Sequence, residues 1–294
     1  MTEQEQGIKY LPAEVFVRIR PLADSGGHAG RQKKENREDF CQLGKFDEES
    51  VDILTATGWT KNPSYNYMKT VVLPQDSQET TFTKLGLPGL IELFLGGYNT
   101  TFLAYGQTGT GKTHTMFGSN LDAVKAHNLE SKQFPEGWGI FPRAIMQAME
   151  IMKERENESV KYVFTANVIE IYFFQVFDLL NNRSTVHANK WGGGDWDFQG
   201  VHQIEIASTK DVSKLIDIMH TNRQSRATGM NDQSSRSHCV ASINLLKIEK
   251  DKEGHKKVSK SSFCFVDLAG SERVEKTGNE AKKSESSWEG ICAN

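Results

Sequence analysis

Short apolar or alternating runs of residues are separated along the whole chain by stretches rich in glycine, proline and charge. Alternation over residues 14–21 predicts a short strand that ends at Pro21, because proline cannot donate to a continuing ladder. A β-branched and apolar run over residues 99–105 predicts a buried strand that leads into a turn at Gly106. The strongest strand pattern lies at residues 162–172.

Two further apolar runs, at residues 240–248 and 262–267, flank a charged stretch and predict a long β-hairpin with a solvated tip. Helical spacing of apolar residues predicts helices over residues 142–156 and 210–220, and a third helix is expected to begin at Lys112. Strands that alternate with helices, with a hairpin added, predict an α/β fold whose mixed central β-sheet is flanked by helices on both faces.

Composition supports a globular chain and excludes several classes. The 294 residues allow one large α/β domain, and 35 Lys+Arg against 38 Asp+Glu give a net charge of −3, so no nucleic-acid partner is expected. No apolar run reaches the roughly 18 residues of a membrane span, and the acidic start does not resemble a secretory signal. We therefore expect no membrane insertion. Four widely spaced cysteines predict neither a disulfide framework nor a zinc site, namely Cys41, Cys239, Cys264 and Cys292.

A phosphate-binding loop follows the strand predicted at residues 99–105. Its sequence satisfies G-x-x-x-x-G-K-[ST], in which glycines turn backbone N–H groups toward phosphate oxygens, the lysine reaches the β- and γ-phosphates, and the hydroxyl binds Mg²⁺. The position between a predicted strand and a predicted helix is the context that this motif requires. The candidate phosphate-binding residues are Gly106, Gln107, Thr108, Gly109, Thr110, Gly111, Lys112 and Thr113.

A carboxylate near the bound metal is expected at the end of a neighbouring strand. Asp267 ends the apolar run at residues 262–267 and is the candidate. Gly270 follows, and its backbone N–H is suited to approach a γ-phosphate, so that the loop senses whether this phosphate is present. Together they predict a nucleotide-dependent switch.

A polar segment at residues 231–238 precedes the strand predicted at 240–248. Composition alone is typical of an ordinary surface loop. Beside a phosphate-binding loop, its hydroxyls are suited to contact the γ-phosphate and the water shell of Mg²⁺. Arg236 would then pair with Glu272, and a pair that forms only when two loops close would report the nucleotide state.

These three segments, GQTGTGKT at 106–113, NDQSSRSH at 231–238 and DLAGSE at 267–272, resemble the P-loop, switch I and switch II of the kinesin motor domain. The resemblance spans essentially the whole chain and includes an R-x-R-P element at residues 18–21. It implies a P-loop NTPase that hydrolyses ATP with Mg²⁺ and moves along or remodels microtubules, in the cytoplasm and on the cytoskeleton.

The resemblance also implies a role for each site residue. Residues 106–112 would hold the phosphates, Thr113 would ligate Mg²⁺ directly, and Asp267 would ligate it through water. The remaining roles fall to two groups. Those at the adenine are Arg18, Arg20, Pro21 and His114, and those that close on the γ-phosphate and order the attacking water are Ser234, Ser235, Arg236, Gly270 and Glu272.

Some segments depart from the family pattern. Residues 84–89 contain two glycines and a proline, so the family's helix there is expected to start late or break near Pro88. Residues 120–138 and 181–200 resemble insertions, and the second, with three consecutive glycines, is predicted to be a flexible surface loop.

Domain boundaries follow from the same resemblance. We expect an N-terminal extension at residues 1–13 and a motor domain at 14–294 that is incomplete, ending at the start of the switch II helix. A family strand that belongs between the strands at 14–19 and 100–105 would be missing. Its loss would leave backbone groups without partners and a face of the core uncovered.

Three functions remain open. The first is an ATP-driven microtubule motor. The second is a nucleotide-binding module without motility, and the third is a microtubule depolymerase, for which residues 54–69 show no suitable basic protrusion. Residues 247–283 carry ten Lys/Arg against seven Asp/Glu, a net charge of +3 that would suit an acidic tubulin surface. Any dimerisation would use regions outside this chain.

Overall fold

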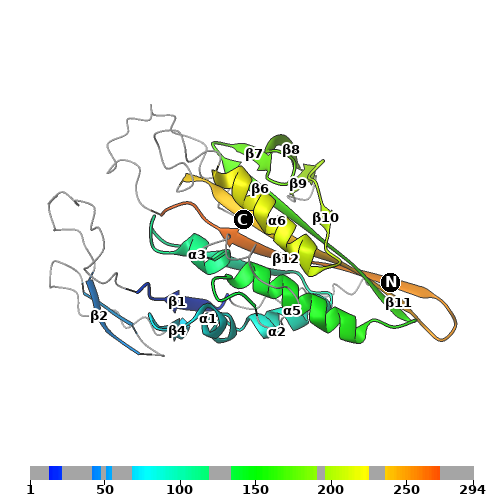
Figure 1. Cartoon of the computed structure of the whole chain (residues 1–294), viewed down its shortest axis with the longest axis horizontal. Helices are drawn as coiled ribbons and strands as arrows, with labels where there is room; N and C mark the ends of the chain where they lie inside the picture. The colour runs from blue at the N-terminus through cyan, green and yellow to red at the C-terminus, as the bar shows by residue number, and fades with distance from the viewer. Residues whose placement is uncertain are drawn as a thin grey trace, which may run out of the picture.

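The computed structural model describes residues 13–21, 42–47, 51–54, 68–118, 134–190, 196–224 and 236–271. Its centre is an eight-stranded mixed sheet (Figure 1). Six pairings between the described strands of this sheet are antiparallel, and the pairing of β5 with β12 is parallel. The strands occur in the order β5-β12-β11-β6-β7-β8-β9, and β10 pairs with β6.

The sheet strands have the following bounds: β5 Thr100–Ala104, β6 Val160–Tyr172, β7 Gln175–Asp178, β8 Ser184–Lys190, β9 Trp196–Gln199, β10 Ile204–Glu205, β11 His238–Lys250 and β12 Lys256–Asp267. The described helices are α1 Gln78–Lys84, α2 Leu87–Leu95, α3 Lys112–Met116, α5 Ile140–Arg155 and α6 Thr209–Gln224. Two small sheets pair β1 (Val15–Arg18) with β4 (Met68–Val72), and β2 (Gln42–Phe46) with β3 (Val51–Leu54). No described helix is long and apolar enough to cross a membrane.

Most of the predicted elements are confirmed. The expected hairpin is present as β11 and β12, paired over their whole length, and the helices predicted at 142–156 and 210–220 are α5 and α6. The helix expected to break near Pro88 is divided into α1 and α2 at Gly86, whose left-handed φ of 70° ends the first helix. Pro88 then lies in the first turn of α2, where its missing N–H is tolerated.

One local prediction is wrong. Residues 181–200 are not simply a loop, because β8 and β9 pair with each other and β8 extends the sheet beside β7. Val186 of β8 is buried against Ile169 and Val176 and anchors this outer part of the sheet. The loop prediction rested on three glycines at residues 192–194, which lie outside the described residues, and the strands on either side were not predicted.

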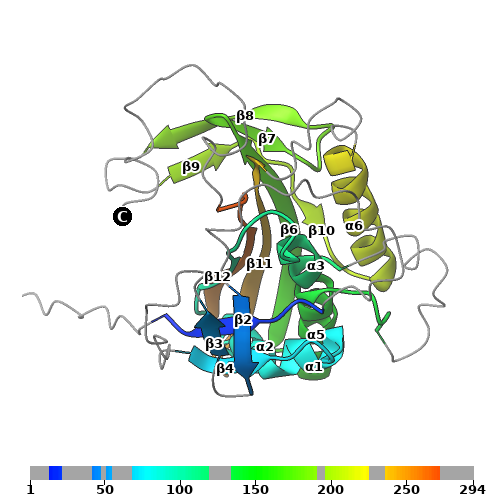
Figure 2. The ribbon, with the colours of Figure 1, turned by 90° about the vertical axis from the view of Figure 1, so that its left-hand side faces the viewer.

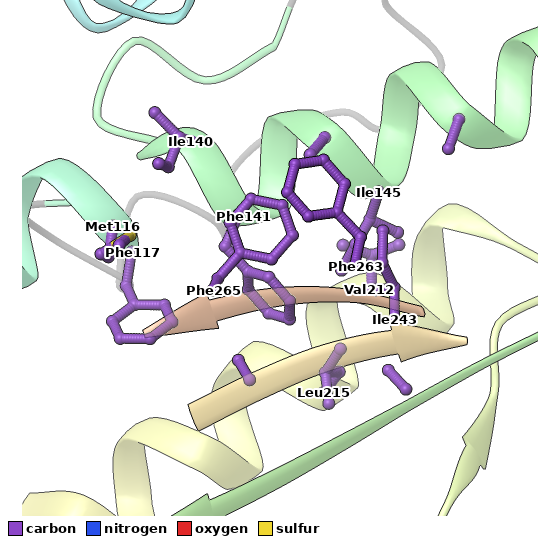
Figure 3. Close-up of a cluster of buried hydrophobic side chains, with 14 of the residues drawn as sticks. Met116, Phe117, Ile140, Phe141, Ile145, Val212, Leu215, Ile243, Phe263 and Phe265 are labelled. Atoms are coloured by element: carbon purple, nitrogen blue, oxygen red, sulfur yellow. The ribbon is translucent and has the colours of Figure 1, made fainter. Parts of the chain in front are cut away.

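The main core lies between the sheet and the helices (Figure 3). Register places Ile243 of β11 opposite Phe263 of β12, and Ala241 opposite Phe265, so these side chains point to one face of the sheet. There they meet Phe141 of α5, whose ring centroid lies 5.3 Å from that of Phe265. Such aromatic burial is the dominant stabilising contribution in a core of this kind.

The described helices cover this one face of the sheet (Figure 2). On the opposite face, register aligns Leu103 of β5 with Val266 of β12 and Val240 of β11. Leu103, Val163 and Val258 are 59%, 40% and 52% exposed on the described surface. The second face therefore has an apolar character that no described helix covers.

Among the described strands, the β1–β4 pair is separate from the eight-stranded sheet. Among the described strands, β1 pairs only with β4, and β5 pairs only with β12, so the two sheets are not joined by a backbone ladder. They approach through side chains, since the rings of Phe16 in β1 and Phe102 in β5 stack with centroids 6.4 Å apart. Ile19 and Val71 form a separate small cluster for the β1–β4 sheet.

Candidate nucleotide-binding site

A cavity of about 1980 Å³ opens at the carboxyl end of β5 and extends between β5 and β1. Ligand pockets usually measure about 300–1,000 Å³, so the cavity exceeds what one nucleotide needs. It combines a phosphate wall, formed by Gly106 and residues 108–113 with Asp267, and a base wall, formed by residues 18–21 with Gln78 and His114. The extra volume corresponds to the interruption between the two sheets.

The P-loop has the backbone that its glycines allow. Gly109 and Gly111 have φ values of 81° and 100°, in the left-handed region that other residues enter only at a cost. Gly111 is also the N-cap of α3, so the loop delivers the chain directly into the helix. The Lys112 ammonium donates to the carbonyl oxygens of Gly106 and Gln107, both at 2.9 Å, and so reaches across the loop.

The two candidate metal ligands lie next to each other. The Thr113 hydroxyl donates to Oδ2 of Asp267 over 2.7 Å, although the two residues are 154 positions apart. Asp267 is 2% exposed, and its Oδ1 atom is buried with no hydrogen-bond partner among the described residues. An adjacent hydroxyl and carboxylate with an oxygen to spare are the hard oxygen donors that Mg²⁺ prefers, so the residues present fit this ion.

Arg223 completes this corner of the site and was missed by the sequence analysis. Both of its terminal nitrogens lie 3.2 Å from Oδ2 of Asp267, and the pair is 11% and 2% exposed. Val212, Ile216 and Met219 form the buried stripe of α6, and Arg223 continues it at i+4. A charged residue on an apolar stripe indicates a buried partner, and that signal was available in the sequence.

The cysteines near the site are ordinary thiols. Cys239 is buried opposite Asp267 in the β11–β12 register, and burial raises the pKa of its thiol to about 12. Cys264 is half-buried, and both are free. Cys41 and Cys292 lie outside the described residues.

The switch II segment is tied to the P-loop through its backbone. Leu268 donates to the Ala104 carbonyl over 3.3 Å, and Ser271 donates to the Gly106 carbonyl over 3.1 Å. These bonds hold Gly270, the predicted γ-phosphate contact, next to the start of the P-loop. Ala269 also donates its N–H to Nδ1 of His238 over 3.1 Å. Burial lowers the pKa of His238, which keeps this acceptor nitrogen free of a proton.

The end of switch I is anchored to a buried acid. Ser237 donates to Oε1 of Glu170 over 2.7 Å, and Arg183 donates to Oε2 of the same carboxylate from Nε and NH2, at 2.9 and 2.8 Å. The Arg183 guanidinium lies 3.9 Å from the centroid of the Phe177 ring. Arg236 is exposed. Ser234, Ser235 and Glu272 lie outside the described residues, so the Arg236–Glu272 pair stays a prediction.

The predicted adenine-side residues line the other wall of the cavity. Arg18 donates to the Thr115 hydroxyl over 2.9 Å, and Arg20 donates to the Gly109 carbonyl, so both arginines reach from the β1 side to the P-loop and its helix. Gln78 links Arg18 to His114 and was also missed by the sequence analysis. The structure therefore brings together the described candidates from both ends of the sequence.

Comparison with known proteins agrees with this geometry. The chain matches the family description "Kinesin motor domain" over residues 18–290. The chain belongs to the kinesin motor domain family. It is 37% identical to kinesin-like protein Klp61F of Drosophila melanogaster over 211 residues, which cover 70% of this chain and 19% of that protein. It is 28% identical to kinesin-like protein KIN-12G of Oryza sativa subsp. japonica over 272 residues, which cover 92% of this chain and 20% of that protein.

A solved structure supports the kinesin fold of this chain. The match is to a chain described as "Structure of a fast kinesin: Implications for ATPase mechanism and interactions with microtubules", with a TM-score of 0.72 and 25% identity. It covers 92% of this chain and 69% of the solved one. The chain also spans about a fifth or less of the length of the curated relatives above, so the activity of a whole protein is a matter for proposal.

Proposed function

We propose that this chain is an ATP-hydrolysing motor domain that couples the turnover of Mg-ATP to movement along microtubules. The observation that carries the proposal is the 2.7 Å bond between Thr113 and Asp267, which joins the P-loop helix to the switch II strand. The partner is inferred from the family, in which motor domains act on microtubules, and the expected location is the cytoplasm and the microtubule cytoskeleton.

The residues of the phosphate wall would bind and orient rather than donate or accept protons. Backbone N–H groups of residues 106–112 and the Lys112 ammonium would hold the phosphates, and Thr113 and Asp267 would hold Mg²⁺, Asp267 through water. Bound Mg²⁺ neutralises charge that develops on the phosphate oxygens. Phosphoryl transfer depends mainly on positioning and charge stabilisation, so the proposal does not require a strong base among the described residues of this wall.

The switch segments would add the dependence on the γ-phosphate. Ser234 and Ser235 would close on it, the Gly270 N–H would contact it, and an Arg236–Glu272 pair would latch the closed state and orient the attacking water. The bond from Ser237 to Glu170 and the bond from Ala269 to His238 support this proposal, because they give both segments fixed ends at the same edge of the sheet.

The test is ATP hydrolysis by the full-length protein, measured with and without microtubules. We expect turnover to rise when microtubules are added, and Lys112→Ala to reduce it by a factor of at least about 10². Lys153→Ala, at an exposed position of α5, is the matched control and should leave turnover unchanged. Tight ATP binding with no response to microtubules would instead indicate the second candidate, a nucleotide-binding module without motility.

A further inference from the structure

Gln78 connects β1 to α3, the elements that carry Arg18 and His114 of the base wall. It is the first residue of α1, it is 5% exposed, and its amide bonds to residues from β1 and from α3. Its Oε1 accepts from Arg18 over 3.1 Å. Its Nε2 lies 2.9 Å from Nε2 of His114 and donates to the His114 carbonyl over 2.8 Å. One buried amide thus holds two side chains that line the cavity.

The hydrogen-bond network fixes the tautomer of His114. A guanidinium only donates, so the amide atom that faces Arg18 must be the oxygen, and the atom that faces His114 must be the NH₂ group. Because that group also only donates, Nε2 of His114 must accept. His114 is therefore neutral and carries its proton on Nδ1, an assignment that rests on the network of donors and acceptors.

The charged groups around His114 come from several elements of the cavity. Arg18 and Arg20 approach from the β1 side. The remaining charged residues that line the cavity are Glu14, Asp76, Lys112, Glu136 and Asp267.

Arg18 is held by two partners at the same time. Besides Gln78, it donates to the Thr115 hydroxyl, which itself donates to the Gly111 carbonyl over 2.9 Å. Burial lowers the pKa of Arg18, opposed by Asp76, yet a guanidinium stays charged near neutral pH. The base wall therefore presents a fixed cation beside a neutral imidazole whose one ring donor is Nδ1–H.

We propose that Gln78 is a positioning residue for recognition of the nucleotide base, because it fixes the Nδ1–H tautomer of His114 and the place of the Arg18 guanidinium. The inference rests on the proposed binding of ATP. Gln78 would contribute to binding of the base and not to binding of the phosphates, because the contacts within the phosphate wall do not involve Gln78. Loss of the amide should therefore weaken ligands that carry a base and spare ligands that do not.

The first experiment reads the tautomer directly, in full-length protein without nucleotide. Long-range ¹H–¹⁵N spectra of ¹⁵N-histidine protein should show His114 protonated at Nδ1 and unprotonated at Nε2. In Gln78→Glu, a carboxylate that only accepts would face both Arg18 and Nε2 of His114, so the Nε2 atom should gain a proton. Thr83→Ala, on the exposed side of α1, should leave the spectrum unchanged. A wild-type His114 that carries its proton on Nε2 would overturn the proposal.

The second experiment separates the base from the phosphates. Binding of ATP and of inorganic tripolyphosphate, each with Mg²⁺, is measured for the wild type, Gln78→Ala, Gln78→Glu and Thr83→Ala. Both Gln78 variants should weaken ATP about 10-fold and leave tripolyphosphate within about 2-fold, a selective change equivalent to roughly 1.4 kcal/mol. An equal loss for both ligands, or no loss for either in Gln78→Glu, contradicts the positioning role.

The two experiments distinguish failure of this inference from failure of the proposed function. If neither ATP nor tripolyphosphate binds the wild type, the proposed function is wrong, and the histidine spectra still decide the state of His114. If both bind and Gln78→Glu changes only the spectra, the tautomer is fixed as inferred but has no part in base recognition, and the proposal is overturned.

Discussion

The two walls of the cavity are built in different ways. The phosphate wall belongs to the main sheet and its core: the P-loop continues β5, and Asp267 ends β12 two residues after the buried Phe265. The base wall takes residues 18–21 from β1 and the segment after it, in a two-stranded sheet whose own cluster centres on Ile19 and Val71. Gln78 of α1 and His114 of α3 complete this wall. Backbone ladders and buried charge fix the first wall, whereas side-chain contacts fix the second to the first.

The difference implies different responses to perturbation. A change at the phosphate wall acts on a buried carboxylate and on the core behind it, so its effect should be global. A change at the base wall should loosen one small sheet and leave the eight-stranded sheet intact, because proteins open in cooperative units that follow their packing. Three experiments test this contrast.

The largest effect is expected at the buried pair between Arg223 and Asp267. Arg223→Ala leaves a carboxylate that is 2% exposed without its cation, and we expect the free energy of unfolding to fall by about 3–5 kcal/mol. The matched control is Arg155→Ala, which breaks a pair with Glu92 whose partners are 46% and 50% exposed and should cost about 0–1 kcal/mol. Urea unfolding of full-length protein gives both values, and equal losses would contradict the contrast.

The second effect is local and lies on the base side. Ile19→Ala removes a buried side chain from the small cluster and should cost about 2 kcal/mol, the low end for such truncations, because its neighbours Val17 and Leu73 are only half-buried. Hydrogen exchange should accelerate in β1 and β4 and not in β11 and β12. Ile243→Ala, in the main cluster, should accelerate exchange across the whole sheet. Uniform acceleration in Ile19→Ala would show that the two sheets open together.

The same contrast explains how much of the site the sequence predicts. The P-loop and Asp267 were predicted because each follows from a local pattern, a glycine-rich motif after a strand and an acid at a strand end. Gln78 and Arg223 were not, because their partners lie 36 to 60 positions away and no local pattern names a partner. Each nevertheless left a trace, since both are polar residues on the buried stripe of a helix.

For the fold, the pattern of apolar residues predicted the long strands and the short strands β1 and β5, and it failed at β8 and β9. The hairpin of β11 and β12 was predicted because apolar runs flank a charged tip. The β8–β9 pair was assigned to a loop, because three glycines dominate its composition and register cannot be read from seven- and four-residue strands. Periodicity carries no information on strand order, so it could not predict that the described strands β1 and β5 lie in separate sheets.

The smallest effect is a dependence of the free energy of unfolding on pH. One histidine lies beside each wall, His114 at the base wall and His238 near the phosphate wall. Burial is the main cause that lowers the pKa of both His114 and His238. An unfolded histidine has a pKa near 6.5, so just below that pH the unfolded chain binds more protons than the folded one, and stability falls as the pH falls below about 6.5. Unfolding between pH 5.5 and 7.5 should show this slope.

Substituting each histidine in turn shows which wall causes the dependence of stability on pH. His238→Gln should reduce the pH dependence of global unfolding, because His238 lies in β11 and accepts from Ala269 of switch II. His114→Gln should change the pH dependence of hydrogen exchange in β1 and β4 and leave the global slope nearly unaltered, because His114 contacts Gln78 and, through it, Arg18. If His114→Gln instead removes the larger part of the global slope, the base wall is coupled to the main core as tightly as the phosphate wall, and the contrast between them fails.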